Sequence, residues 1–300
     1  MSGALALLDA AGGSSVVSGR LLALAATVVA AGAVTFRLTV ARTTGEGEAT
    51  AVRWGMWASA LLLVCAVPRL WLQARGLVDP GDPVLPMAAN VLGTRWGEGW
   101  LLQLAGAIVT GAGFIVAARR PTAGRWLCVA GTAALVVAPA FMGHAIAVRR
   151  LRWLAVTADV AHTLAAASWT GALTMLAACA ARLRGSAARG ETLARMIAAF
   201  HPVALISAAV VVATGAAGVW LRVDPLSSLL RSGYGAILAA KVALAIGVAA
   251  FGARHARRGQ EDARRGATTL ERSLRAEVLL ALLTIVATAL LTGSPPEPDA

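Results

Sequence analysis

Charged residues are scarce in this chain. Only 14% of its 300 residues are Asp, Glu, Lys or Arg, whereas 58% are hydrophobic, and a soluble domain carries about 25% charged residues. The sequence has one lysine, Lys241, and one tyrosine. This composition excludes an ordinary soluble domain and favours a protein embedded in a membrane.

Several motifs are also absent from the sequence. Its three cysteines form no CxxC pair, so we expect small buried hydrophobic side chains and no disulfide framework. No nucleotide-binding motif occurs, so we expect neither ATP hydrolysis nor another enzymatic activity. The net charge of +12 does not predict nucleic-acid binding, because the arginines fall in short breaks between apolar runs, where they orient a membrane protein. The amino-terminal residues lack a basic region before the first apolar run, so we expect that run to be retained as a span.

Long apolar runs separated by short polar breaks predict an all-α, polytopic transmembrane helix bundle of about eight spans. We expect one membrane domain over residues 1–300, surrounded by lipid. Longer connections are expected at 75–98, which contains three prolines, and at the basic stretch 254–272. The predicted spans are 18–41, 53–74, 99–118, 125–147, 153–181, 198–221, 233–253 and 270–292.

The arginines predict the orientation of these spans. Seventeen arginines fall on one set of alternate span ends and loops, and nine fall on the other. The richer side should be cytoplasmic, which places both termini outside. Eight of the nine tryptophans fall near predicted span ends, as in an aromatic belt. Trp169 is the exception, because it lies well inside the fifth span.

Polar residues in residues 141–171 predict a functional site in the outer half of the membrane. His144 lies near the outer end of the fourth span, and His162 lies roughly 14 Å below the outer surface in the fifth. Asp159 shares a helix face with His162, and Lys241 enters the seventh span at a similar depth. Ionisable groups inside a membrane usually mark a functional site, and two imidazoles at compatible depths can share a metal ion.

Met142 and Trp169 have two interpretations each. Met142 could join His144 as a metal ligand only if the helix has opened at Gly143, because residues two apart point to opposite sides of a helix; packing is the simpler role. Trp169 lies two turns below His162 on the same face. It could close the path beneath a metal site, or it could fill the core.

The other polar residues also have simpler interpretations. An ion pair between Asp159 and Lys241 could be a structural lock between helices. At the inner side, His201 and Glu277 could form a second polar point. For His201, and for His255 in the basic stretch, a position at the membrane interface is the simpler interpretation.

Several segments resemble the CopD/PcoD copper-resistance family. They are GHA at 143–145, DVAHTLAAASWTGAL at 159–173, TG at 214–215, YGAILAAK at 234–241 and the closing LERSLRAEVLLALLTIVATALLTGSPP. The resemblance implies an eight-span protein of the bacterial cytoplasmic membrane. Such a protein would receive copper ions from a periplasmic, cupredoxin-like (CopC-type) partner and move them inward. The residues that match recurring family positions are His144, His162, Trp169, Tyr234, Lys241 and Glu277, whereas His201 and His255 depart from the family pattern.

Two other functions fit the same residues. The first is a b-type cytochrome that holds haem between histidines of neighbouring helices. His144 and His162 flank a very short turn, which leaves little room for the macrocycle. The second is a non-transporting assembly factor that docks a copper carrier and passes the metal to a membrane oxidase. It would need the same outer metal site as a transporter.

Overall fold

The computed structural model describes residues 13–143, 151–222, 232–266 and 268–293. These ranges contain eight helical segments that are long and apolar enough to cross a membrane, and no strand. The predicted all-α polytopic bundle is therefore confirmed, and each predicted span coincides with one of the eight segments. Because the number of spans is even, the start of the first span and the end of the last span lie on the same side of the membrane.

The first four spans are built from α2 to α7. The first span is composite, because α2 (Ser14–Phe36) continues through the π-helical turn η1 (Arg37–Ala41) into α3 (Arg42–Thr44). The next helices are α4 (Glu48–Arg75), the short α5 (Val84–Leu92), α6 (Arg95–Ala117) and α7 (Pro121–Met142).

The last four spans follow from α8 onward. The long helices α8 (Arg152–Arg182) and α9 (Arg189–Arg222) form an antiparallel pair. The seventh span is again composite, and the eighth pairs with it. The seventh span consists of α10 (Gly233–Arg254), η3 (His255–Gly259) and α11 (Gln260–Arg264). The eighth span lies in the last helix, α12 (Thr268–Leu291).

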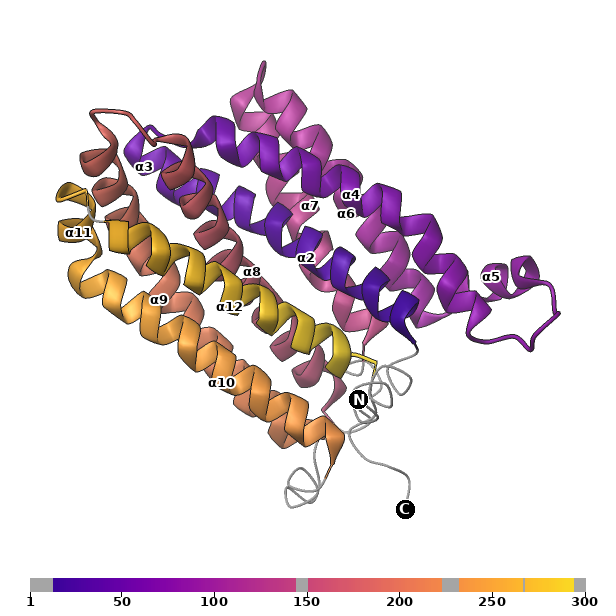
Figure 1. Ribbon diagram of the computed structural model, residues 1–300. Helices are drawn as coiled ribbons and strands as arrows, with labels where there is room; N and C mark the ends of the chain where they lie inside the picture. Colours follow the sequence, from indigo (N-terminus) through magenta and orange to yellow (C-terminus); the bar gives the residue numbers. More distant parts are fainter. Residues whose placement is uncertain (1–12, 144–150, 223–231, 267, 294–300) are drawn as a thin grey trace.

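Helices α2 and α8 form the centre of the bundle. α2 runs between the group made by α4, α6 and α7 and the group made by α8, α9, α10 and α12 (Figure 1). The two central helices cross where glycine faces glycine. A Cβ at Gly171 would lie 2.2 Å from the Val28 carbonyl oxygen and 2.6 Å from the Gly32 Cα. Only glycine permits this approach, because any other side chain would overlap the backbone of the neighbouring helix.

Two segments expected as connections are partly helical. Residues 75–98 contain α5, which begins after Pro83 and packs Val84, Ala88 and Val91 against the end of α4. The stretch 254–272 continues as helix to Arg264, so the connection between the seventh and eighth spans is shorter than the sequence predicted. The reason is that η3 turns His255 inward, where it is only 9% exposed, while Arg257 and Arg258 stay exposed.

Apart from Trp169, which was predicted to lie inside a span, Trp100 is the tryptophan that departs from the predicted belt. Six are exposed on the outside of the bundle, as lipid-facing indoles would be. Trp169 is buried, as its place inside a span predicted, but Trp100 is buried too. The Trp100 indole N–H donates a hydrogen bond to the Ala66 carbonyl at 2.9 Å, which ties α6 to α4. The exposed six are Trp54, Trp57, Trp71, Trp126, Trp153 and Trp220.

The glycine crossing leads to a stability prediction. Gly171→Ala should lower the apparent melting temperature in detergent, because the new methyl group must push α2 and α8 apart, a change that costs about 1–3 kcal/mol. Gly218→Ala is the matched control, since a Cβ at Gly218 would meet no atom within 4 Å. Intrinsic fluorescence during heating measures both variants. Equal melting temperatures for the two variants would show that the crossing tolerates a methyl group.

Candidate functional site

His162 lies in the N-terminal half of the central helix α8 and contacts α9. Its Nδ1 lies 3.0 Å from the hydroxyl oxygen of Thr214. The neighbouring Gly215 also faces the ring, because a Cβ there would lie 3.7 Å from His162 Cε1. Thr214 and Gly215 are therefore the residues of α9 that face this imidazole.

The hydrogen bonds of Thr214 determine which nitrogen of His162 carries the proton. The Thr214 hydroxyl donates to the Val210 carbonyl within its own helix at 2.6 Å, so its single hydrogen is already used. With its hydrogen directed at that carbonyl, the hydroxyl accepts from His162, so we expect Nδ1 to carry the hydrogen. In the neutral imidazole the lone pair is consequently on Nε2, a nitrogen that commonly binds metals in proteins. A metal-binding histidine is usually oriented by such a bond from its other nitrogen.

The rest of the predicted outer cluster is only partly placed. His144 lies outside the described residues. Asp159, one turn before His162, and Lys241, on α10, are both half-buried. Their pairing with each other stays a prediction.

Met142 is the last residue of α7, and Gly143 after it is extended, with φ −107° and ψ −169°. The helix has therefore opened at Gly143, which was the condition for Met142 and His144 to serve one site. However, Met142 faces a cation in this structure: a guanidinium nitrogen of Arg69 lies 3.7 Å from its sulfur. A positive charge at that distance disfavours a metal cation on the same sulfur.

Arg69 is held inside the bundle by polar partners from two other helices. Its other terminal nitrogen donates to the side-chain oxygen of Gln103 on α6. The Gln103 amide in turn donates to the Thr27 hydroxyl on α2 at 3.3 Å. These bonds satisfy the guanidinium in an apolar environment and fix α4 against α2, α6 and α7.

Trp169 lies seven residues beyond His162 on α8, about 10 Å further along the helix axis. It is 6% exposed, and its indole N–H has no hydrogen-bond partner among the described residues. A Cβ at Gly252 would lie 3.9 Å from Trp169 Cζ2 and 3.6 Å from a carboxylate oxygen of Glu277. Trp169 is thus placed between His162 and a second group of polar residues.

That second group joins the seventh and eighth spans at the arginine-rich end. Ser273 and Glu277 lie one turn apart on α12, and His255 of η3 lies beside both. The His255 Nδ1 is 2.9 Å from Glu277 Oε2, and its Nε2 is 2.6 Å from the Ser273 hydroxyl. All three side chains are buried, with Glu277 only 1% exposed.

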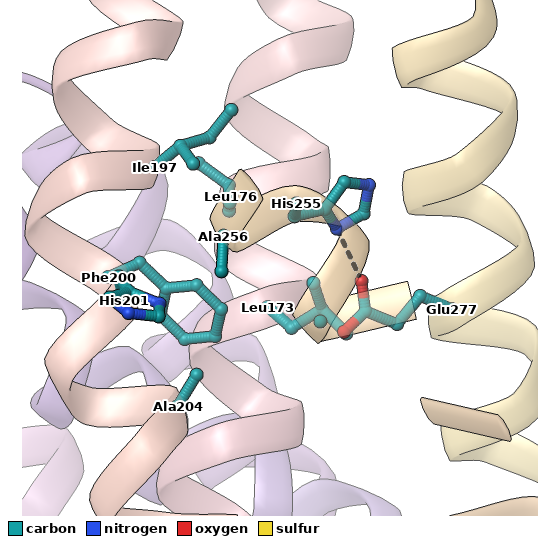
Figure 2. A pocket seen from close by; sticks show the side chains of 10 residues that line it. Leu173, Leu176, Ile197, Phe200, His201, Ala204, His255, Ala256 and Glu277 are labelled. Carbon is teal, nitrogen blue, oxygen red and sulfur yellow. Dashed lines mark ion pairs between the residues drawn. The ribbon is translucent and has the colours of Figure 1, made fainter. Parts of the chain in front are cut away.

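A small cavity lies next to this pair (Figure 2). Its volume is about 20 Å³, which is enough for one water molecule. His201 lines it from α9, on the side away from Glu277 (Figure 2). The predicted inner polar point is therefore present around one cavity, but the partner of Glu277 is His255 and not His201. His255 was expected at the membrane interface. Its role as a buried partner could have been inferred from the S-x-x-x-E spacing of Ser273 and Glu277. This spacing puts two polar groups on one face of an apolar helix, where they need a polar partner.

No three His, Cys, Asp or Glu side chains converge as a metal site within the described ranges. Cys128 and Cys179 are buried, as expected, and Cys65 is half-buried; all three are free thiols.

Two family models match the chain. The model described as "Copper resistance protein D" matches residues 194–291, and the model described as "Copper resistance protein D-like, N-terminal domain" matches residues 10–151. Neither the search of curated proteins nor that of solved structures found a match. The first model covers most of α9 to α12, and the second ends where α8 begins.

The tautomer of His162 can be tested directly. In protein labelled with ¹⁵N-histidine, His162 should show a protonated Nδ1, because Thr214 offers only an acceptor. Thr214→Val removes that acceptor while keeping the shape of the side chain, and should shift the equilibrium toward the other tautomer. Thr214→Ser should preserve the native pattern. Thr174→Val is the matched control, since the Thr174 hydroxyl donates to the carbonyl of Thr170 on its own helix. An unchanged His162 spectrum in Thr214→Val would contradict the assignment.

Proposed function

The chain belongs to the copper resistance protein D family, and from this premise we propose that it moves copper ions across the bacterial cytoplasmic membrane. The chain is a multi-pass membrane protein by its eight spans. The observation that carries the proposal is the hydrogen bond of His162 to Thr214, which orients a neutral nitrogen ligand inside the outer half of the central helix.

The copper site would consist of His162 and His144. Imidazole binds copper in either oxidation state, and two such ligands make a site from which the ion can be released. Asp159 would add a negative charge one turn away, and Lys241 would balance that charge when copper is absent. Because Met142 contacts Arg69, we assign it to packing and to closing the outer end of α7 rather than to the metal.

The direction of transport and the partner follow from the family resemblance. Copper would be delivered from outside by a cupredoxin-like, CopC-type protein and would leave at the arginine-rich side, which the positive-inside rule makes cytoplasmic. Copper uptake into sealed vesicles that contain the purified protein, with and without the carrier, tests this proposal. Uptake that requires the protein supports a transporter, whereas copper that is bound but never enters would favour an assembly factor.

Replacing either histidine should remove the copper site. In His162→Ala and in His144→Ala, copper bound per purified protein should fall at least tenfold, because one remaining imidazole cannot hold the ion. Metal analysis after gel filtration measures this. Leu164→Ala, an exposed position on the same helix, is the control and should bind copper like the parent. If both histidine variants also bind like the parent, the site is elsewhere.

Trp169 should affect transport without affecting binding. It lies about 10 Å beyond His162 and fills the core between the two polar groups, so we propose that it controls passage below the copper site. Trp169→Phe retains much of the bulk but loses the N–H. Copper binding should persist in this variant while vesicle uptake changes by severalfold. Unchanged uptake with unchanged binding would leave Trp169 a packing residue.

A further inference from the structure

The buried group of Ser273, His255 and Glu277 is not explained by copper binding at His162. Both nitrogens of His255 already face a polar partner, Glu277 at 2.9 Å and Ser273 at 2.6 Å. In this arrangement the imidazole has no nitrogen directed at the cavity, so it is poorly placed to bind a metal. Its role must instead lie in its contacts with the carboxylate and the hydroxyl beside it.

The three residues can accommodate one proton more or less without losing a partner. When the imidazole is neutral with hydrogen on Nδ1, its Nε2 accepts from the Ser273 hydroxyl. When the imidazole is protonated, Nε2–H donates to the same oxygen, and the hydroxyl rotates away. A serine is suited to both states because its hydroxyl can donate or accept. The geometry is therefore that of a group built to change its protonation.

Glu277 lines the cavity together with His255. Neither carboxylate oxygen has a hydrogen bond from a described residue, although Oε2 lies close to Nδ1. The short distance makes an ion pair, but the N–H does not point at the oxygen. A carboxylate that is 1% exposed and lacks a donor is costly as an anion, and a proton removes that cost. The cavity beside it has room for one water molecule, through which a proton could arrive or leave.

Among the described residues that line the cavity, Glu277 is the one acid. Helix α8 contributes only Leu173 and Leu176 to the lining, and α9 contributes His201 as its one titratable side chain. His201 is exposed and so lies where the cavity meets the outside of the bundle. Arg254, next to His255, lies 3.4 Å from Asp262 in a surface ion pair. With one shared proton the His255–Glu277 pair has zero net charge, the state that a low-dielectric site favours.

We propose that Ser273, His255 and Glu277 form a proton-binding site at the arginine-rich end of the bundle, and that proton exchange at Glu277 accompanies cation passage. The coupling to a cation rests on the transport proposed above. A positive charge moving past Trp169 toward this end raises the electrostatic cost of the shared proton, which leaves Glu277 as a carboxylate. One proton is released, no bond to the metal is needed, and no electron is transferred.

The proton site can be tested without any metal. Infrared difference spectra of the purified protein between acidic and alkaline pH should show the C=O band of a protonated buried carboxyl group. Glu277→Gln should abolish that band. His255→Gln should keep the band and move its titration, because the carboxyl group loses its proton-sharing partner. Glu261→Gln is the control, since Glu261 is an exposed carboxylate of α11 at the same end. Parent and Glu277→Gln spectra that match would overturn the proposal. If Glu277→Gln does not fold, an unshifted titration in His255→Gln would overturn it.

Coupling is tested in sealed vesicles with a pH-sensitive dye inside and the membrane potential clamped by potassium and valinomycin. Copper uptake by the parent should change the interior pH, and Glu277→Gln should lose at least most of that change. Copper uptake with no pH change in the parent would overturn the coupling and leave the transporter standing. A titrating Glu277 band with no copper uptake would instead overturn the proposed transport and leave the proton site standing.

Discussion

The contact between Gly32 and Gly171 is the constraint on which the arrangement of both polar groups depends. It brings the backbones of α2 and α8 together at the centre of the bundle, so α8 has one fixed height and one fixed rotation relative to the other spans. His162, nine residues earlier on α8, then meets Thr214 of α9. Trp169, two residues before the glycine, reaches Gly252 on α10. A bundle without this crossing would have no reason to keep α8 at a fixed height between Thr214 of α9 and Gly252 of α10.

The polar residues inside the bundle are stabilised in different ways at its two ends. On the outer side, Arg69 is satisfied by neutral partners from α6 and α7, and His162 by a neutral hydroxyl. These bonds involve no acid and are suited to holding fixed orientations. At the arginine-rich end, His255 faces a carboxylate and a hydroxyl. A buried acid beside a base is the arrangement on which the proposed proton site depends.

The sequence predicted the spans well because each must supply about 20 apolar residues to cross lipid. It predicted their ends poorly where a helix continues beyond the membrane. Helix α9 begins at Arg189, well before the predicted 198, because Leu193, Met196 and Ile197 pack into the core while Arg195 stays exposed. Hydropathy indicates which residues can lie in lipid, but it does not indicate the full length of a helix. It therefore does not detect amphipathic extensions such as the start of α9.

The candidate residues could be predicted by type but not by partner. An imidazole or a carboxylate inside apolar sequence is visible as an unusual residue, which is how His162 and Glu277 were found. Their partners, Thr214 and His255, are common residues of their segments, a threonine in an apolar helix and a histidine among arginines. The π-helical turn at His255–Gly259 adds a further obstacle. It adds a residue to one turn, so helical periodicity alone assigns His255 to the wrong face.

The separation of the two polar groups limits how an ion can cross. His162 and Trp169 are about 10 Å apart along α8, and the cavity beyond Trp169 holds only about 20 Å³. A hydrated ion does not fit such a space, so in the proposed transport the ion would have to exchange its water for protein ligands before it reached the tryptophan. Imidazole nitrogens can make that exchange for copper, whereas the inner end offers a carboxylate whose charge depends on a proton. In the proposed transport, entry and exit would therefore depend on different chemistry: coordination by imidazole would select the ion at one end, and charge balance would govern its departure at the arginine-rich end.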